Sequence, residues 1–294
     1  MLSKVLSQYA TIRENESMKH HTTFGIGGTV SMLVVPNTVT DIPTILRICS
    51  EAEKRVVILG NGSNVLFSDD PSDMIVLKNH CKEISFGECM VSVSSGYMLT
   101  ACAFEAAKRS LAGLEFAYGI PGSVGGGVYM NAGAYGGELS QVITKTTYCD
   151  YNGNIYAICG DAHQFGYRHS VFKEMKNICI LHTEMQLTHG DEQEIRQTMD
   201  DLMQRRRDKQ PLEYPNAGSV FKRPAGMFAG KLIEDCGLKG YRIGGAQVSE
   251  KHAGFIVNRG EATANDVKTL IDHIQKTVFA RFGVELECEI EMIG

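Results

Sequence analysis

The sequence predicts an α+β protein with more than one domain. Its 294 residues are enough for two or three domains, and 43% hydrophobic with 21% charged residues is an ordinary globular composition. Short apolar segments with strand character alternate with helical segments, and a proline-bounded segment, 211–215, sets off the last part of the chain. That part mixes helices with short strands and is predicted to form an α+β domain of its own.

Composition and charge exclude several classes of protein. The net charge is −5, so no basic excess indicates a nucleic-acid partner. No run of 18 apolar residues predicts a transmembrane helix, and residues 1–20 lack an apolar signal core. The nine cysteines are odd in number and never spaced Cys-x-x-Cys, which indicates reduced thiols and no zinc site. We therefore expect a cytoplasmic protein without nucleic-acid, membrane or metal partners.

The first half of the chain is predicted to alternate helices and strands. A short amphipathic helix over 2–9 precedes a strand over 31–35. Thr40 or Asp41 can cap the next helix, which has Pro43 in its first turn. Its apolar residues repeat at helical spacing: Ile42, Ile45, Leu46 and Cys49. Further strands are predicted at 56–59, from 65, and at 74–77, 84–86 and 90–94, followed by a helix over 98–108.

The second half begins with a predicted hairpin, whose strands 142–150 and 154–158 flank an Asn152-Gly153 turn. A strand over 178–187 and a charged helix over 191–208 follow. The remaining predicted elements are a helix over 225–236 closed by Gly237, short strands through 257, a helix over 264–281 and a strand over 284–293.

Residues 113–137 form the most distinctive segment. Nine of them are glycine, but large apolar residues such as Phe116, Val124 and Val128 lie between the glycines, so the segment is predicted to be buried and not a flexible linker. Buried glycines allow positive φ angles and close approach of another group. Successive free N–H groups in such a loop would make a concave site for a phosphate or pyrophosphate. The alternative is a glycine-rich packing segment.

A second glycine-rich loop, 60–64, follows the predicted buried strand 56–59. It matches neither Gly-x-Gly-x-x-Gly nor the Gly-x-x-x-x-Gly-Lys-Ser/Thr fingerprint of nucleotide-binding proteins. By itself, Asn61-Gly62 is typical of a tight hairpin turn. Two glycine-rich loops that both follow apolar runs favour one extended cofactor instead.

From residue 22 to residue 294 the chain resembles the UDP-N-acetylenolpyruvoylglucosamine reductase family. The resemblance is carried by seven motifs in order: Thr22–Gly28, Leu59–Asn64, Gly119–Gly122, Asn131–Gly136, Tyr167–Phe172, Asn216–Ser219 and Glu287–Glu289. It implies a two-subdomain FAD-binding module of the vanillyl-alcohol-oxidase type plus a C-terminal α+β substrate-binding domain. The implied boundaries are 1–190, with subdomains of about 1–78 and 79–190, and 191–294.

The chain departs from parts of the family in three places. Only 51 positions separate Arg168 from Ser219, which resembles the shorter subgroup that lacks an inserted tyrosine loop over the substrate. Arg223 stands where many members have asparagine, so nucleotide contacts are expected to differ. His21 also stands where asparagine is frequent, with little expected consequence.

The resemblance implies an enzyme that uses FAD and NADPH to reduce UDP-N-acetylenolpyruvoylglucosamine to UDP-N-acetylmuramate for peptidoglycan synthesis, as a monomer. One alternative is a non-catalytic flavin- or UDP-sugar-binding protein on the same fold. Another is an oxidase of the wider flavin fold, many of which tether FAD through His or Cys. Neither residue type occurs in 60–64 or 113–137, so we expect dissociable FAD.

Three residues are implied to be catalytic. Arg168 would stabilise negative charge on the substrate, because a guanidinium binds a carboxylate through two hydrogen bonds and stays charged. Glu289 would donate a hydrogen bond in its protonated form. Strand alternation alone leaves four acids equivalent, and the resemblance selects this one. Ser219 would deliver the final proton. The alternatives are a structural ion pair for Arg168, a solvent-exposed acid at 289 and a turn residue at 219.

The resemblance also implies the binding residues. Those for the cofactor are Thr23, Gly60, Asn61, Gly62, Ser63, Asn64, Gly119, Ile120, Pro121, Gly122, Asn131, Gly133, Ala134, Tyr135 and Gly136. Those for the substrate are Tyr167, Lys209, Lys222 and His252.

Overall fold

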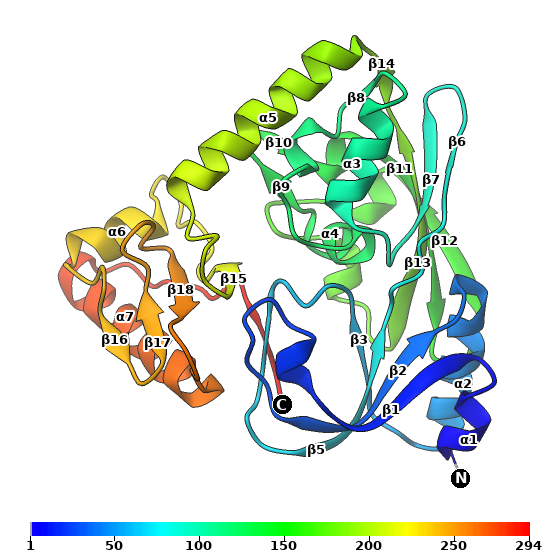
Figure 1. Ribbon diagram of the computed structural model, residues 1–294, viewed down its shortest axis with the longest axis horizontal. Helices are drawn as coiled ribbons and strands as arrows, with labels where there is room; N and C mark the ends of the chain where they lie inside the picture. The colour runs from blue at the N-terminus through cyan, green and yellow to red at the C-terminus, as the bar shows by residue number, and fades with distance from the viewer. Residues whose placement is uncertain (1) are drawn as a thin grey trace. The chain divides into compact units, whose positions relative to one another are not determined.

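The structure, a computed structural model, describes residues 2–294 (Figure 1). Contacts within the chain divide it into two compact units that are discontinuous in sequence. Unit 1 comprises residues 1–15, 31–61 and 73–205, and unit 2 comprises residues 16–30, 62–72 and 206–294. Segments 16–30 and 62–72 therefore group with the C-terminal part of the chain. The predicted domains, by contrast, are continuous in sequence and divide at residue 190. The domain boundaries stay a prediction.

Unit 1 is built on two sheets. The first has the order β1-β2-β5-β3, with β1 Ala10–Ser17, β2 Thr29–Pro36, β5 Ser72–Lys78 and β3 Val56–Leu59. The second has the order β12-β11-β13-β7-β6, with β12 Ile155–Cys159, β11 Ile143–Asp150, β13 Ile178–Gln186, β7 Met90–Ser94 and β6 Ile84–Phe86. Two short pairs accompany them: β8 Leu111–Ala112 with β14 Thr188–His189, and β9 Gly133–Ala134 with β10 Gly137–Glu138.

Apolar helix faces complete the two cores of unit 1. Helices α1 (Leu2–Leu6) and α2 (Ile42–Glu51) share a buried cluster with the first sheet and with Cys149, Cys179 and Leu181 of the second. Asp41 occupies the N-cap position of α2, and the four apolar residues predicted for its face are all buried. Helices α3 (Leu99–Ala107) and α4 (Val124–Met130) pack with β7, β11 and β13 in the other cluster.

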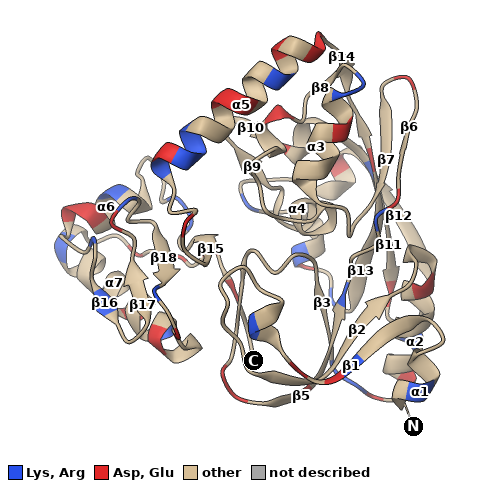
Figure 2. Cartoon of the chain, in the orientation of Figure 1, with Lys and Arg blue, Asp and Glu red and all other residues tan. Residues whose placement is uncertain are grey.

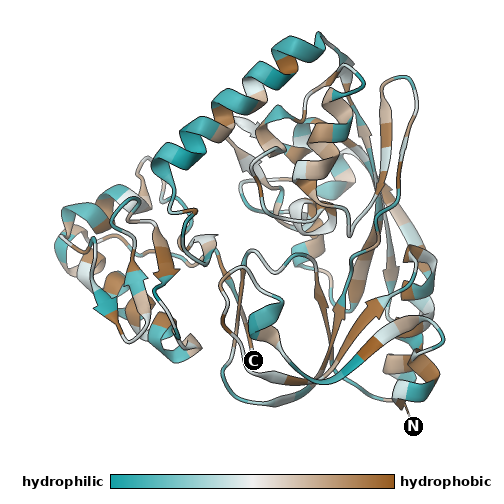
Figure 3. Ribbon diagram, viewed as in Figure 1, coloured by the Kyte–Doolittle hydropathy of each residue, from teal (hydrophilic) through white to brown (hydrophobic). Residues whose placement is uncertain are grey.

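Helix α5 (Glu192–Lys209) is mostly hydrophilic, as predicted (Figure 3). Only Ile195 and Met199 of this helix are buried. Acidic residues lie in its first turn and basic residues in its last, as Figure 2 shows. This arrangement favours the helix because it opposes the partial charges of the helix dipole.

Unit 2 has a four-stranded sheet of order β15-β18-β17-β16, formed by β15 Asn216–Ser219, β18 Phe255–Asn258, β17 Ala246–Val248 and β16 Arg242–Ile243. Helices α6 (Ala229–Asp235) and α7 (Ala264–Phe282) contribute to its core. Strands β4 (Val65–Phe67) and β19 (Glu291–Ile293) form a parallel pair. Phe24, Ile26 and Leu66 are buried in the same core as the C-terminal elements, so these early segments are part of unit 2.

The α+β class is confirmed. The hairpin alternative for Asn61-Gly62 is excluded, and three local expectations need correction. Asn61-Gly62 is not a hairpin turn, because β3 pairs with β5 whereas β4 pairs with β19. Helix α4 was not predicted, since glycines at 125–127 disfavour helix; Ser123 caps it, and buried Val124 and Val128 anchor it. Helix α6 begins at residue 229, after a turn at 225–227, and the final strand is limited to 291–293.

Among the helices of residues 2–294, none combines the length and the apolar character needed to cross a membrane.

Candidate active site

The two glycine-rich loops meet within unit 1. Asn61 Nδ2 donates a hydrogen bond to the Pro121 carbonyl at 2.6 Å. A Cβ atom added at Gly60 would lie only 2.2 Å from Ser123 Oγ, so a side chain here would displace the hydroxyl that caps α4. The sequence prediction that both loops serve one extended ligand is consistent with this contact.

The N–H groups at the start of α4 are used within the protein. Val124 N donates to Tyr97 O and Gly125 N donates to Ser95 O, each at 2.8 Å. Gly126 N donates to the capping Ser123 Oγ at 3.4 Å. The concave anion site expected from successive free N–H groups is therefore not formed by 124–126. A Cβ at Gly125 would lie 2.6 Å from Ser95 Cβ, so close packing is the reason for glycine there.

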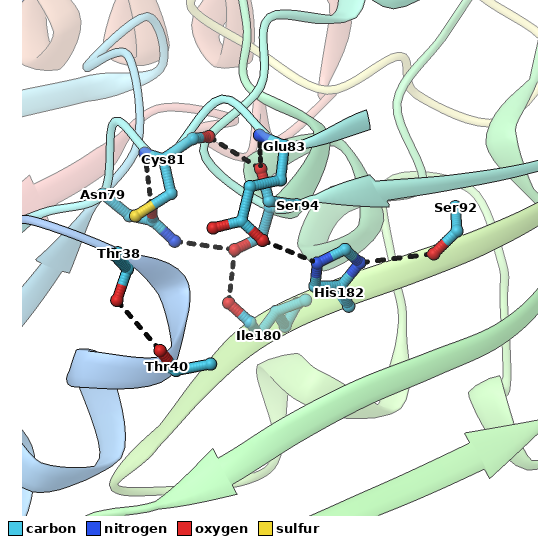
Figure 4. A network of polar contacts seen from close by, with 10 residues as sticks. Thr38, Thr40, Asn79, Cys81, Glu83, Ser92, Ser94, Ile180 and His182 are labelled. Atoms are coloured by element: carbon cyan, nitrogen blue, oxygen red, sulfur yellow. Dashed lines mark hydrogen bonds and ion pairs between the residues drawn. The ribbon is translucent and has the colours of Figure 1, made fainter. Parts of the chain in front are cut away.

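A buried polar network supports both loops. Asn79 N donates to Leu59 O, just before Gly60, at 2.9 Å. The Asn79 side chain donates to Ser95 Oγ at 2.7 Å, and Ser95 Oγ donates to the Ile180 carbonyl (Figure 4). Because Ser95 O also accepts from α4, this network joins the end of β3, the strand β13 and the start of α4. Sequence reasoning missed Asn79, Ser95 and Ser123, since isolated polar residues carry no motif.

Arg168 lies in a tight turn of unit 1. Gly166 and His169 exchange two backbone hydrogen bonds, both 3.1 Å long, across Tyr167 and Arg168. Arg168 has a φ of 54°, in the left-handed region that favours glycine. Its Nη2 donates to the Gly133 carbonyl at 3.2 Å, which brings the predicted catalytic arginine to the predicted cofactor segment 131–136.

That cofactor segment ends in the β9–β10 hairpin. Tyr135 (φ 55°) and Gly136 (φ 91°) form its two-residue turn, and two positive φ angles are typical of a type I′ turn. The Tyr135 side chain is 44% exposed although it occupies a conformation that favours glycine or asparagine. Strained backbone of this kind is often found at ligand-binding sites.

Ser219 and Glu289 are brought close together within unit 2. Ser219 is the last residue of β15 and is paired with Phe255 of β18. Glu289 N donates to the carbonyl of Val220, the neighbour of Ser219, at 2.8 Å. Glu289 and Glu291 are partly buried whereas Glu285 and Glu287 are exposed, so burial narrows the four acids that strand alternation left equivalent to two.

Two predicted cofactor residues of unit 2, Thr23 and Asn64, are bonded to the segments that carry this pair. Asn64 Nδ2 donates to the Glu289 carbonyl at 3.0 Å. Thr23 Oγ1 donates to Asn216 O at 2.7 Å, and Thr23 N donates to Gly62 O at 3.0 Å. Thr23 thus attaches its loop to the strand that carries Ser219, and Asn64 attaches its loop to the segment that carries Glu289. Contacts of the loop 62–64 with a ligand would therefore come mainly from its backbone and Ser63.

The predicted substrate residues are distributed over both units. In unit 2, Lys222 Nζ is paired with the Glu287 carboxylate, and Lys209 is exposed at the end of α5. His252 Nδ1 accepts from Gly254 N at 3.1 Å, so Nε2 carries the proton in the neutral ring. Burial lowers the pKa of His252, which favours that neutral form. Tyr167 belongs to unit 1 and is 52% exposed in the Arg168 turn.

All nine cysteines are free thiols. Within residues 2–294, no group of three or more His, Cys, Asp or Glu is arranged to hold a metal ion.

Comparison with known proteins identifies two domains and a family. Residues 23–158 match the model of an FAD binding domain, and residues 210–293 match the C-terminal domain of UDP-N-acetylenolpyruvoylglucosamine reductase. A UDP-N-acetylenolpyruvoylglucosamine reductase of Clostridium novyi is 46% identical over 96% of this chain and 92% of its own. This chain belongs to the UDP-N-acetylenolpyruvoylglucosamine reductase family. A reductase of Caldanaerobacter subterraneus is 45% identical over 95% of this chain and 93% of its own.

A solved structure of a family member supports the fold. The reductase of Thermus caldophilus has a TM-score of 0.83 and 31% identity, and the match covers 97% of this chain and 99% of that one. The predicted FAD-binding module with a C-terminal domain is thereby confirmed. The residues fit FAD: the two loops that meet at Asn61 and Pro121 lie inside the matched FAD-binding segment, and Glu115 is the only charged residue in their sequences.

Proposed function

We propose that this protein is an NADPH-dependent flavoenzyme that reduces UDP-N-acetylenolpyruvoylglucosamine to UDP-N-acetylmuramate for peptidoglycan synthesis. The observation that carries the proposal is the 46% identity to a reductase of that name across 96% of the chain, because it includes both the FAD-binding and the C-terminal segments. Bound FAD would take up hydride from NADPH and pass it to the enolpyruvyl double bond. The protein must then bind, orient and protonate the substrate.

In this proposal Arg168 stabilises charge on the substrate. A guanidinium holds a carboxylate through two hydrogen bonds and keeps its charge, so it favours the electron-rich state formed after reduction. The exposed Tyr167 beside it contacts the substrate. A strained turn that presents a charged side chain is the observation that supports this role over a structural ion pair.

Ser219 and Glu289 act together in the proposal. Ser219 gives its proton to the carbon next to the carboxylate, and Glu289 donates a hydrogen bond while protonated. Their placement on adjacent backbone segments supports this pairing. Lys209, Lys222 and the neutral His252 bind the anionic and polar groups of the substrate. Lys222 is the nearest cation to Ser219 in sequence and aids its proton delivery.

The cofactor is held, chiefly through the backbone, by loop 60–64 and by segments 119–122 and 133–136 of loop 113–137. FAD is dissociable, because loops 60–64 and 113–137 contain no His or Cys to form a covalent link. The protein acts as a monomer in the cytoplasm, where NADPH is found. Nine free thiols support a reducing compartment.

One anaerobic experiment tests the proposal. NADPH should bleach the flavin absorbance, and the enolpyruvyl substrate should then restore it without oxygen while UDP-N-acetylmuramate forms. A protein that only binds flavin or UDP-sugars would bind the substrate without re-oxidation, and this result would reject the proposal. Denaturation should release the flavin; flavin that stays attached to the chain would indicate a covalent link.

A further inference from the structure

The turn that carries Arg168 is strained and needs external support. Arg168 is the third residue of the turn 166–169, where its φ of 54° suits glycine. A non-glycine residue persists in this conformation only when its surroundings fix it. The backbone bonds between Gly166 and His169 close the turn but do not attach it to the rest of unit 1.

Asn131 provides such an attachment. Its Nδ2 donates to the Gly166 carbonyl at 3.0 Å, and its Oδ1 accepts from Ser140 N at 2.9 Å. The residue is 0% exposed and has a φ of 47°. A side chain without accessible surface cannot contact a ligand that occupies accessible space. Asn131 therefore does not fit the cofactor-binding role that its motif implied.

Two further bonds join the same segments. Ser170 Oγ, also 0% exposed, donates to the Tyr129 carbonyl at 2.8 Å. Arg168 Nη2 donates to the Gly133 carbonyl. Residues 129–133 thus hold the turn on both sides of Arg168 and also contact its side chain.

We propose that Asn131 is a positioning residue that fixes the Arg168 turn, and that it is not a ligand of the cofactor. The inference rests on the proposed function for the role of Arg168. It predicts that loss of the Asn131 side chain impairs the step that needs Arg168 and spares flavin binding.

Asn131→Gly is the most direct test, because glycine tolerates the left-handed backbone and removes only the two side-chain bonds. Re-oxidation by substrate should slow about 10- to 100-fold, as expected when a reacting group is misplaced. FAD affinity and flavin reduction by NADPH should stay within about twofold. Asn177→Gly is the matched control: Asn177 is exposed, has a φ of 55° and should show no change. Ser170→Ala should slow re-oxidation less, and it serves if Asn131→Gly does not fold.

A double variant shows whether Asn131 acts through Arg168. Asn131→Gly with Arg168→Ala should re-oxidise no more slowly than Arg168→Ala alone. Hydrogen exchange gives a second readout: the amides of 166–170 should exchange at least about tenfold faster in Asn131→Gly but not in Asn177→Gly.

Two outcomes overturn the inference. Weaker FAD binding in Asn131→Gly with unchanged exchange at 166–170 would make Asn131 a cofactor residue. A full additional slowing in the double variant would show that Asn131 acts independently of Arg168. If Arg168→Ala re-oxidises like the wild type, the proposed role of Arg168 fails instead, and the exchange data still decide whether Asn131 holds the turn.

Discussion

Arg168 in unit 1 and the Ser219–Glu289 pair in unit 2 are held in place in different ways. The Arg168 turn is attached to unit 1 through side chains, from Asn131 and Ser170 to backbone carbonyls. Ser219 and Glu289 are positioned mainly by backbone contacts, through the pairing of β15 with β18 and the bond from Glu289 N to Val220 O, with one side-chain bond from Asn64 Nδ2 to the Glu289 carbonyl. Single side-chain changes should therefore displace the arginine more readily than the serine and the glutamate.

The difference has a physical origin. A strand residue receives its direction from the pleat and from the ladder to the neighbouring strand, which for Ser219 is β18. A left-handed residue in a turn has no ladder and is opposed by its own backbone preference. Unit 1 thus needs specific supporting residues around its proposed catalytic group. In unit 2 the sheet positions Ser219, and a backbone bond to the neighbouring Val220 positions Glu289.

The largest expected effect comes from Ser219→Ala. The change removes one hydroxyl from a strand that is held by its backbone, so folding and FAD binding should survive. Flavin reduction by NADPH needs no proton from Ser219 and should be near normal. Re-oxidation by substrate should slow by about a hundred- to ten-thousandfold, the usual effect of losing a general acid. Stopped-flow absorbance under argon measures the two half-reactions separately.

The control for that experiment is Ser219→Cys, which should recover part of the rate because a thiol is also a proton donor. Equal slowing of both half-reactions in Ser219→Ala would make Ser219 a structural residue and place the proton donor elsewhere.

Arg168→Ala and Glu289→Ala should each slow re-oxidation by about a hundredfold or more while FAD and bleaching by NADPH are retained. Both remove a group that stabilises charge after reduction. The same stopped-flow measurement applies. If either variant re-oxidises at the wild-type rate, that residue has no part in the mechanism. It would then no longer belong in the comparison of how the two units position catalytic groups.

Much of the fold could be predicted from the sequence, because the patterns that indicate helices and turns lie within short stretches of the chain. Helical spacing gave α2, and the Asn152-Gly153 turn gave the β11–β12 hairpin. The hydrogen bonds that support the proposed site could not be predicted from such patterns. Asn79, Ser95 and Ser170 are single polar residues whose partners lie far along the chain, so no spacing reveals them.

The proposed role of Asn131 illustrates a second limit of prediction from the sequence. Its motif is Asn131–Gly136, and the resemblance implied cofactor binding for Asn131 and for Gly133, Ala134, Tyr135 and Gly136. Only burial and bond partners separate Asn131, which is wholly buried, from Tyr135, which is exposed. A motif locates a site, but accessibility in three dimensions decides which of its residues can contact a ligand.

Lowering the pH should destabilise the folded protein through protonation of His163, which lies close in sequence to the Arg168 turn. This buried ring donates from Nδ1 to Gly160 O, accepts from Thr146 at Nε2, and stacks on Phe165 just before the Arg168 turn. Burial lowers its pKa below the usual 6.5, so the folded state disfavours the proton. Its stabilising contribution is complete above about pH 6.5 and declines as the pH falls from there toward the folded-state pKa.

Urea unfolding at pH 7 and at pH 5.5 measures this contribution. The wild type should lose more stability between the two pH values than His163→Phe, which keeps the stacking but cannot titrate. His252 has a pKa lowered in the same direction and should leave a remaining slope in both proteins. An identical pH dependence in the wild type and the variant would show that His163 titrates alike in folded and unfolded chains.

The smallest effect is expected from Glu287→Gln, which tests whether Glu289 in unit 2 is positioned by backbone contacts. The Glu287 side chain is 72% exposed and is paired with Lys222, whereas the Glu287 carbonyl accepts from Lys222 N at 2.8 Å. The substitution removes the ion pair but keeps that backbone bond, which lies two residues from Glu289. Exposed ion pairs contribute about 0–1 kcal/mol, so the free energy of unfolding should change by less than about 0.5 kcal/mol. The limiting rate of re-oxidation should be unchanged, and the half-saturating substrate concentration should fall if the released Lys222 binds the anionic substrate. A tenfold fall in the limiting rate would mean that Glu289 is placed by a side chain after all, and the contrast with Arg168 would no longer hold.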